Sequence, residues 1–194
     1  MLTNSHFHSS LLGDTGNFSK MSVMGTRIKF ILVLFAVVTS VGCDQVSKHF
    51  AKSILQHSVP LSFFADVLRF HYAENPGIAF SIGSGLPAAT RTGLFVVGTS
   101  ISLTLLMIYI FRSRHESTSH LLALSLILGG GMGNLLDRIF RDGRVIDFLN
   151  LGVGDFRTAI FNVADAAITC GIVLLLFSTF RPSRKESISH ELNP

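Results

Sequence analysis

The chain has 194 residues, of which 48% are hydrophobic and only 14% are charged. A soluble domain carries about 25% charged residues, so this composition excludes an ordinary soluble protein and favours an integral membrane protein. The net charge of +4 is small and is divided among short loops, so we expect contact with membrane lipid and no nucleic-acid partner.

Four apolar segments predict four membrane-spanning helices, because a helix that crosses a bilayer needs about 20 predominantly apolar residues. These segments lie at about 28–45, 92–111, 120–137 and 159–180. We expect them to form one domain over residues 27–181. Residues 1–26 are polar and predict a disordered extension, and residues 182–194 predict a polar tail. An even number of spans puts both termini on the same side of the membrane.

The basic residues leave the orientation of the predicted helices open. The 16 Lys and Arg residues divide evenly between the two sides of the bundle, so the positive-inside rule gives a tie. The side that holds both termini packs its charges into shorter segments, which mildly favours it as the cytoplasmic side.

The first apolar segment also has the pattern of a signal peptide, with a basic start, an apolar run and small residues at its end. The sequence SVGC at Ser40–Cys43 resembles a lipoprotein cleavage box, which would make Cys43 a lipid anchor. Three further apolar spans argue against this interpretation. We instead expect Cys43 and Cys170 to be buried thiols, because both lie in apolar runs without a CxxC spacing or any metal-type spacing.

The connection between the first two spans, from Asp44 to Arg91, is long for a helix bundle. Its segment LSFFADVLRF, residues 61–70, spaces its apolar residues irregularly, between the patterns of an amphipathic helix and a strand. We expect a small element that lies on the membrane surface rather than a separate domain.

Two of the predicted spans carry the same Asn-x-x-Asp spacing on one helical face. Asn134 and Asp137 end the third span, and Asn162 and Asp165 begin the fourth. Polar faces of this kind turn inward, away from lipid. Glycines at positions 129, 130 and 133 should let another helix backbone come close.

Simpler structural roles remain open for several of these polar residues. They are interhelical hydrogen bonding by Asn134 and Asn162, an ion pair of Asp137 with Arg138, and an ion pair of Asp44 with Lys48.

Asp147 lies in the sequence VIDFL, where apolar neighbours draw a predicted loop toward the membrane boundary. Two carboxylates at the same membrane edge, Asp147 and Asp165, would titrate as a coupled pair with one ionised and one protonated. Such a pair supplies a general base and a general acid and predicts a catalytic dyad. A cation or proton path and an inert pair of acids remain open alternatives, as does the identity of the protonated aspartate.

Five motifs, read together and in order, resemble the bacterial lipoprotein signal peptidase family, signal peptidase II. They are DQVSK at 44–48, NPGIAFS at 75–81, GGGMGNLLDR at 129–138, VIDF at 145–148 and FNVAD at 161–165.

The resemblance implies an intramembrane aspartic endopeptidase that acts on lipidated prolipoproteins, N-terminal to the diacylglyceryl-modified cysteine. It implies an all-α membrane protein of four transmembrane helices, with a small periplasmic β-cradle and an amphipathic surface helix over the site. It further implies a monomer in the bacterial inner membrane, with both termini in the cytoplasm and the active site near the periplasmic face. No metal and no cofactor are implied.

The same resemblance assigns roles to individual residues. Asp147 and Asp165 match the catalytic dyad. Positions that bind substrate or support the site are matched by Asp44, Asn75, Gly77, Asn134, Asp137, Arg138, Asn162 and Ala164. One residue departs from the pattern, because Glu74 stands where the family usually has Arg, which leaves the electrostatics of substrate contact open.

Overall fold

A computed structural model describes residues 6–77, 87–113 and 116–179 of the chain. Within these residues lie four helices and one small sheet. The helices are α1 (His6–Leu55), α2 (Ala88–Arg112), α3 (Thr118–Phe140) and α4 (Val163–Thr179). The strands are β1 (Leu61–Phe63), β2 (Leu68–Asn75), β3 (Val145–Val153) and β4 (Phe156–Arg157).

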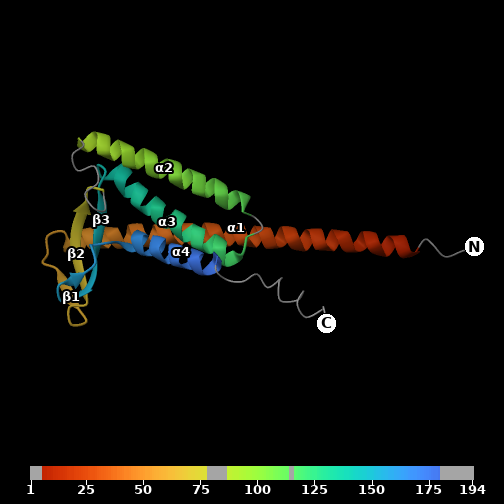
Figure 1. The fold of residues 1–194 in the computed structure, drawn as a ribbon, viewed down its shortest axis with the longest axis horizontal. Coiled ribbons are helices and arrows are strands. Elements are labelled where there is room, and N and C mark those ends of the chain that lie inside the picture. The colour runs from red at the N-terminus through yellow and green to blue at the C-terminus, as the bar shows by residue number, and fades with distance from the viewer. Residues whose placement is uncertain (1–5, 78–86, 114–115, 180–194) are drawn as a thin grey trace, which may run out of the picture.

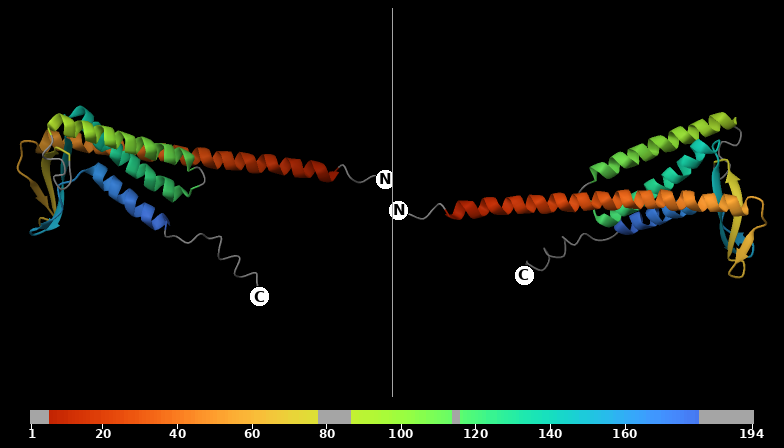
Figure 2. Two further views of the ribbon diagram at one scale, coloured as in Figure 1. Left: turned by 45° about the horizontal axis from the view of Figure 1, so that its top comes forward. Right: turned by 180° about the vertical axis from the view of Figure 1, so that it is seen from behind.

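The helices run alternately up and down, and the sheet stands across one end of the bundle (Figure 1). α1 and α3 end at the sheet, whereas α2 and α4 begin there. The N-terminal half of α1 projects beyond the other helices on the far side, as both views of Figure 2 show. Both connections that form the sheet, α1 to α2 and α3 to α4, therefore meet at the same end of the bundle.

The sheet has four antiparallel strands in the order β1-β2-β3-β4. In the register of β2 and β3, Ala73 lies opposite Asp147 and Asn75 lies opposite Val145. Because alternate residues of a strand share a face, Asn75 and Asp147 point to the same side of the sheet. The prediction that VIDFL is a loop was therefore wrong, since pairing with β2 makes it part of a strand.

The described part of the connection after α1, residues 56–77, contains strands and turns and no helix. The amphipathic surface helix is therefore absent from this part, and residues 78–86 lie outside the described residues. Phe64, Ala65 and Asp66 all have positive φ angles, which a right-handed helix does not allow. The chain turns back here, and β1 pairs with β2 from Leu61 opposite Phe70 to Phe63 opposite Leu68.

Three helical segments are long and apolar enough to cross a membrane: Arg27–Leu55, Ala88–Arg112 and Thr118–Phe140. The fourth predicted span begins at Val163 instead of residue 159, and its 17 residues extend about 25 Å. α2 presents most of its large apolar side chains outward, whereas Ile110 is buried and Leu103 and Leu106 pack against the core around it. These features agree with a multi-pass membrane protein of three long apolar helices and a shorter fourth.

Two further predictions differ from the structure. The backbone is helical from His6, where we expected a disordered extension over residues 1–26. The reason is that no proline before Pro60 interrupts the helix, and adding residues to a helix that has already formed costs little free energy. Cys43 and Cys170 are free and exposed rather than buried, because each lies on an outward face of its helix.

α3 is the central helix and contacts α1, α2 and α4. The predicted close approach at its glycines is confirmed. A Cβ atom at Gly133 would lie 2.5 Å from Oδ2 of Asp44, and one at Gly130 would clash with the carbonyl oxygen of Ala164. Gly129 likewise faces Ser40 of α1. These contacts bring the polar faces of α1, α3 and α4 together beneath the sheet.

Candidate active site

Asp147 lies on β3 with only 3% of its surface exposed. Its strand neighbours Ile146 and Phe148 are also buried and belong to the apolar core beneath the sheet. The carboxylate accepts two hydrogen bonds, from Nδ2 of Asn75 at 3.0 Å and from Nδ2 of Asn162 at 2.7 Å. Both donors are neutral amides, and no Lys, Arg or His side chain among the described residues contacts the Asp147 carboxylate directly.

Asp165 lies in the first turn of α4, where it closes a capping box with Asn162. The backbone N–H of Asp165 donates to Oδ1 of Asn162 at 2.9 Å, and the backbone N–H of Asn162 donates to Oδ2 of Asp165 at 3.2 Å. This reciprocal arrangement satisfies donors that a helix otherwise leaves open at its start. The positive end of the helix dipole also favours a negative charge at this position.

Asn134 and Asn162 connect the two carboxylates. Asn134 donates from Nδ2 to Oδ1 of Asp165 at 2.8 Å. Its Oδ1 accepts from Nδ2 of Asn162 at 3.1 Å, and the same Nδ2 reaches Asp147. Interhelical hydrogen bonding by the two asparagines, which we predicted as a simpler role, is present and forms part of this link. The structure thus brings Asp147 and Asp165 into one continuous network of side-chain amides.

Gly77 orients Asn75 toward the site. Its φ of +120° is a conformation that side-chain-bearing residues rarely adopt. In this conformation its backbone N–H donates to Oδ1 of Asn75 at 3.0 Å. Since Oδ1 is engaged there, Nδ2 of Asn75 faces Asp147 as a donor.

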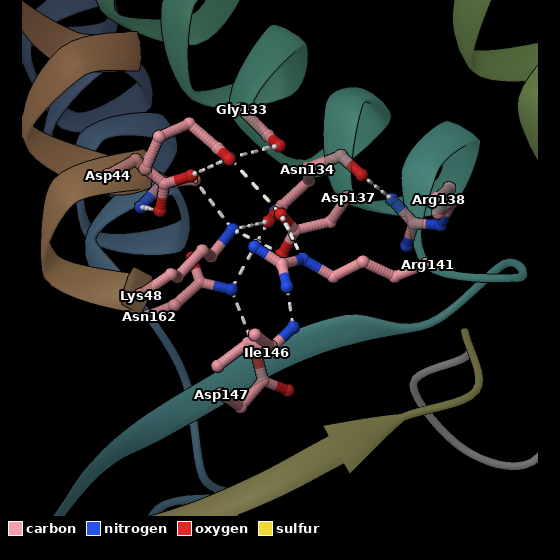
Figure 3. Close-up of polar contacts among 12 residues, drawn as sticks. Asp44, Lys48, Gly133, Asn134, Asp137, Arg138, Arg141, Ile146, Asp147 and Asn162 are labelled. Atoms are coloured by element: carbon pink, nitrogen blue, oxygen red, sulfur yellow. Dashed lines mark hydrogen bonds and ion pairs between the residues drawn. The ribbon is translucent and has the colours of Figure 1, made fainter. Parts of the chain in front are cut away.

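A second buried cluster surrounds Lys48, as Figure 3 shows. Its side chain is fully buried, and Nζ contacts Oδ2 of Asp44 at 2.8 Å and Oδ2 of Asp137 at 3.0 Å. The third contact of Nζ is Oδ1 of Asn134 at 3.0 Å. The predicted ion pair of Asp44 with Lys48 is confirmed, but it belongs to a buried cluster that also includes Asp137.

Asp44 and Asp137 also hold neighbouring backbone. Oδ1 of Asp44 accepts from the backbone N–H of Ala164 at 2.9 Å, and Ala164 is fully buried. Oδ2 of Asp137 accepts from the backbone N–H of Ile146 at 3.1 Å. Asp44 therefore fixes the start of α4 beside Asp165, while Asp137 fixes β3 beside Asp147.

The predicted ion pair of Asp137 with Arg138 is not formed. Asp137 pairs with Lys48 and, at 3.2 Å, with Nε of Arg141 one turn later. Adjacent residues on a helix do not face each other, whereas residues four apart do. Arg138 donates from Nη1 to the backbone oxygen of Asn134, and its buried Nε has no hydrogen-bond partner among the described residues. The charge of Arg138 is attracted by both Asp147 and Asp165.

Burial raises the pKa of Asp147 to about 6, mainly because the ionised form loses its hydration. The hydrogen bonds from Asn75 and Asn162 oppose this rise, since they favour the ionised form. Repulsion by the charge of Asp165 raises the pKa further, and the more distant Lys48 lowers it slightly. Asp147 can therefore hold a proton close to neutral pH, which an ordinary surface aspartate does not.

A cavity of about 370 Å³ opens onto Asp165 from the side of α4. Its walls come from the β3–β4 region and from the first two turns of α4. They consist of Leu151, Thr158, Phe161, Asp165, Ala166, Thr169 and Cys170. This cavity gives one carboxylate of the pair direct contact with the surroundings of the bundle, while Asp147 stays enclosed.

The sequence reasoning missed the central position of Lys48 and the contribution of Gln45. Nε2 of Gln45 donates to Oδ1 of Asp137 and to the backbone oxygen of Gly133, both at 3.1 Å. Helical spacing could have indicated the position of Lys48, since residues 44 and 48 lie on one face of a membrane helix and each carries a charge. Their partners on α3 are more than 80 residues away in the chain, so spacing alone did not show them.

Glu74, the departure from the family pattern, is turned away from the dyad. It pairs with Arg144 at 2.9 Å and accepts a hydrogen bond from the hydroxyl of Tyr72 at 2.8 Å. Alternation along β2 puts its side chain on the opposite face of the sheet from Asn75.

Comparisons with known proteins agree on one family. A family model described as signal peptidase (SPase) II matches residues 34–181. A lipoprotein signal peptidase of Chlorobium phaeobacteroides is 38% identical over 73% of this chain and 86% of that protein. One from Streptomyces griseus is 34% identical over 92% of this chain and 88% of its own length.

Solved structures share the same fold. Two chains described as bacterial membrane enzymes studied by the in meso method have TM-scores of 0.63 and 0.62 to this structure. Their sequence identities are 24% and 27%. The alignments cover 80% and 81% of this chain and 94% and 92% of the solved chains.

Proposed function

The chain belongs to the signal peptidase II family, and we propose that it removes signal peptides from lipidated prolipoproteins through acid–base catalysis by Asp147 and Asp165. The hydrolysed bond lies N-terminal to the diacylglyceryl-modified cysteine. One observation carries the aspartic mechanism: two carboxylates from different elements meet in one network through Asn162 and Asn134. An aspartic peptidase needs two carboxyl groups that share a proton.

Asp147 is the general acid in this mechanism. It is buried on β3 without a direct cation partner among the described residues, and its raised pKa of about 6 favours the protonated form that an acid requires. Asp165 is the general base. It begins α4, receives hydrogen bonds from Asn134 and from the backbone of Asn162, and lines the open cavity. These features suit a base, because hydrogen bonds hold the carboxylate in place and the cavity lets water reach it.

The reaction follows from these roles. Ionised Asp165 takes a proton from water, and the water oxygen attacks the scissile carbonyl carbon. Protonated Asp147 donates its proton to the carbonyl oxygen, which gives a tetrahedral intermediate. The carbon–nitrogen bond then breaks as Asp165 returns its proton to the leaving amine and Asp147 recovers a proton from the intermediate. The two aspartates end in their starting protonation states, and no covalent intermediate with the enzyme forms.

Neighbouring groups support this chemistry. Arg138 carries a buried Nε without a partner among the described residues, and its positive charge is attracted by both aspartates. It is suited to stabilise the negative charge that develops on the substrate. Asn75 and Asn162 hold Asp147, while Asp44, Asp137, Asn134 and Ala164 fix the surrounding helix ends.

The same proposal includes the topology. Four crossings of the inner membrane, with both termini in the cytoplasm and the sheet on the periplasmic side, put the dyad where the lipid-bearing cysteine of a prolipoprotein emerges. The same proposal takes the protein to act as a monomer. Reporter fusions after Arg112 and at the C-terminus test this topology, and periplasmic reporter activity at the C-terminus would contradict it.

Cleavage of a lipidated prolipoprotein by the purified protein in detergent tests the mechanism. Asp147→Asn and Asp165→Asn should each lower kcat by about 10²–10⁴-fold, the usual effect of a lost acid or base. Asp155→Asn, an exposed acid between β3 and β4, is the matched control and should cleave normally. Full activity in either dyad variant would overturn the assignment.

The rival interpretation, a path for protons or cations through the same acids, predicts a different outcome. Wild-type protein in liposomes would then conduct ions, and Asp147→Asn and Asp165→Asn would alter that flux while prolipoproteins stayed uncut.

A further inference from the structure

The outward face of α4 continues the cavity at Asp165 along the length of the helix. Asp165, Ala166, Thr169 and Cys170 line the cavity. Further along the same face, Ile172, Val173, Leu176 and Phe177 are large exposed apolar residues. We define this face of α4, from Asp165 to Phe177, as the α4 track. It spans 12 residue steps, or about 18 Å.

We propose that the α4 track docks the apolar helix of the signal peptide and leads its C-terminal end to Asp165. This inference rests on the proposed function and specifies which part of the substrate binds which surface. It assigns to α4 a role in recognition beyond that of Asp165 itself.

The other face of α4 is already occupied. α4 packs closely on α3, where a Cβ atom at Gly171 would lie 2.7 Å from both the backbone oxygen of Ala123 and the side chain of Ile127. Among the described elements, α4 also contacts α1 but not α2. The α4 track therefore points away from the described helices, at membrane depth, where an additional helix can lie beside it.

Length and direction favour a helix as the occupant. A signal peptide has an apolar region of 7–15 residues, which as a helix extends about 10–22 Å and matches the 18 Å track. A transmembrane signal helix ends at its cleavage site, and the α4 track likewise ends at Asp165. Ala166, Thr169 and Cys170 are small, so a second helix backbone can approach closely near the reacting bond.

A second cavity in the molecule lacks these features. It has a volume of about 420 Å³ and lies between the end of α1 and the sheet. Its lining includes Phe50, Leu55 and Phe148 but neither dyad aspartate. A substrate bound there would not bring its scissile bond to Asp165.

The two native cysteines allow a direct test. Cys170 lies in the cavity, whereas Cys43 is exposed on α1 and lines neither cavity. The test uses the Asp147→Asn variant, which we expect to bind substrate without cutting it. Single cysteines are placed in turn at each position of the signal-peptide helix of a lipidated prolipoprotein, whose own cysteine is blocked by its lipid. Disulfide formation is then measured in membranes, since it requires Cα atoms about 4.4–6.8 Å apart.

We expect cross-links to Cys170 that recur every three to four substrate positions, as one face of a helix passes the α4 track. The cross-links should persist when Cys43→Ser is added and disappear when Cys170→Ser is added. Cross-linking without periodicity, or only to Cys43, would overturn the proposal. So would labelling of Cys170 by a photoreactive acyl chain on the substrate when no peptide position cross-links, because the acyl chain would then be the occupant.

The outcome is separable from the proposed function. Cys43→Ser protein with Asp147 intact must cleave the same prolipoprotein at the wild-type rate. Cleavage without periodic cross-linking refutes the α4 track alone, whereas absent cleavage refutes the proposed function.

Discussion

Two groups of carboxylates lie side by side in this protein, and their charges are balanced differently: Asp44 and Asp137 are fully buried, whereas Asp147 is buried beside the half-buried Asp165. Asp44 and Asp137 share the ammonium of Lys48 and accept backbone hydrogen bonds from Ala164 and Ile146. The bonds recorded for Asp147 come only from neutral amides of Asn75 and Asn162. The first group is compensated in charge, whereas the second lacks a direct cation.

The difference matches the roles we propose, which are structural for Asp44 and Asp137 and reactive for Asp147 and Asp165. A compensated carboxylate keeps its charge, and its hydrogen bonds fix the backbone around it. A buried carboxylate with neutral partners gains or loses a proton near physiological pH, which an acid–base catalyst must do. Lys48 joins the groups, because it holds Oδ1 of Asn134, whose amide reaches Asp165. The rigid cluster thereby orients the groups that surround the reactive pair.

Removing the shared cation should break the compensated group and have the largest effect on stability. Lys48→Met leaves two buried carboxylates without their ammonium. Loss of one partner of a buried ion pair typically costs about 3–5 kcal/mol. We expect a decrease of this size in the free energy of unfolding, measured in mixed detergent micelles.

Lys52→Met is the matched control for this change, since Lys52 is exposed one turn later on α1. Its effect should stay within about 0.5 kcal/mol, as for most surface substitutions. Adding Asp44→Asn to Lys48→Met should recover part of the loss. Equal stability of the two lysine variants would show that the cluster is not compensated by Lys48.

Replacing Asp147 by a neutral residue should have the opposite effect on stability and raise the free energy of unfolding near neutral pH. The folded-state pKa of Asp147 is about 6, above the ordinary 3.8, so its stabilising contribution is complete below the ordinary pKa and is lost as pH rises through about 6. Asp147→Asn should therefore be more stable than wild type at pH 7.5, by up to about 3 kcal/mol at 1.36 kcal/mol per pKa unit. The two proteins should be nearly equal at pH 4, and thermal unfolding at both values measures this. A variant that is less stable at pH 7.5 would contradict the uncompensated burial of Asp147.

The pH dependence of cleavage sharpens the comparison further. If protonated Asp147 is the acid, kcat/KM should fall as pH rises through about 6. Asn75→Ala removes a hydrogen bond that favours the ionised form, so it raises the pKa and moves this fall to higher pH by about one unit. Tyr72→Phe, on the same strand, is the control and should leave the profile in place. A shift to lower pH in Asn75→Ala would assign the fall to another group.

The sequence allowed the polar face shared by Asn162 and Asp165 to be predicted, but little of the compensated cluster around Lys48. Asn162 and Asp165 lie within one helical turn, so spacing alone predicted a shared polar face. The long apolar runs located the four helices in the same way, but not the ends of α1, which extends from His6 to Leu55 and so well beyond the predicted 28–45. Apart from its predicted pair with Asp44, the position of Lys48 was harder to predict, because its partners Asn134 and Asp137 come from another helix and only close packing at Gly133 brings them within reach.

The sheet was the least predictable element for a related physical reason. The run VIDFL is apolar on both sides of Asp147, and such a run does not distinguish a loop, a helix or a buried strand. Its conformation depends on pairing with β2, more than 70 residues earlier in the chain. The segment at 61–70 likewise turns at Phe64–Asp66 through positive φ angles, which the residue types Phe, Ala and Asp do not predict.

The pair of Glu74 and Arg144 extends the comparison to an exposed ion pair, where we expect the smallest effect. More than half of the Arg144 side chain is exposed, so Glu74→Gln should cost less than about 1 kcal/mol at pH 7. The hydrogen bond from Arg144 lowers the pKa of Glu74, so this contribution is present above the ordinary pKa and is lost as pH falls through the lowered one. Cleavage should be nearly unchanged, since Glu74 faces away from Asn75.

Glu74→Arg, which restores the residue that the family usually has here, puts two like charges together and should be less stable than Glu74→Gln. Adding Arg144→Glu should restore the pair with its charges exchanged. If Glu74→Gln instead lowers kcat/KM more than tenfold, the opposite face of the sheet takes part in substrate contact. Charges that act on the substrate would then include Glu74 on the outer face of the sheet, and not only Asp147 and Asp165 inside the bundle.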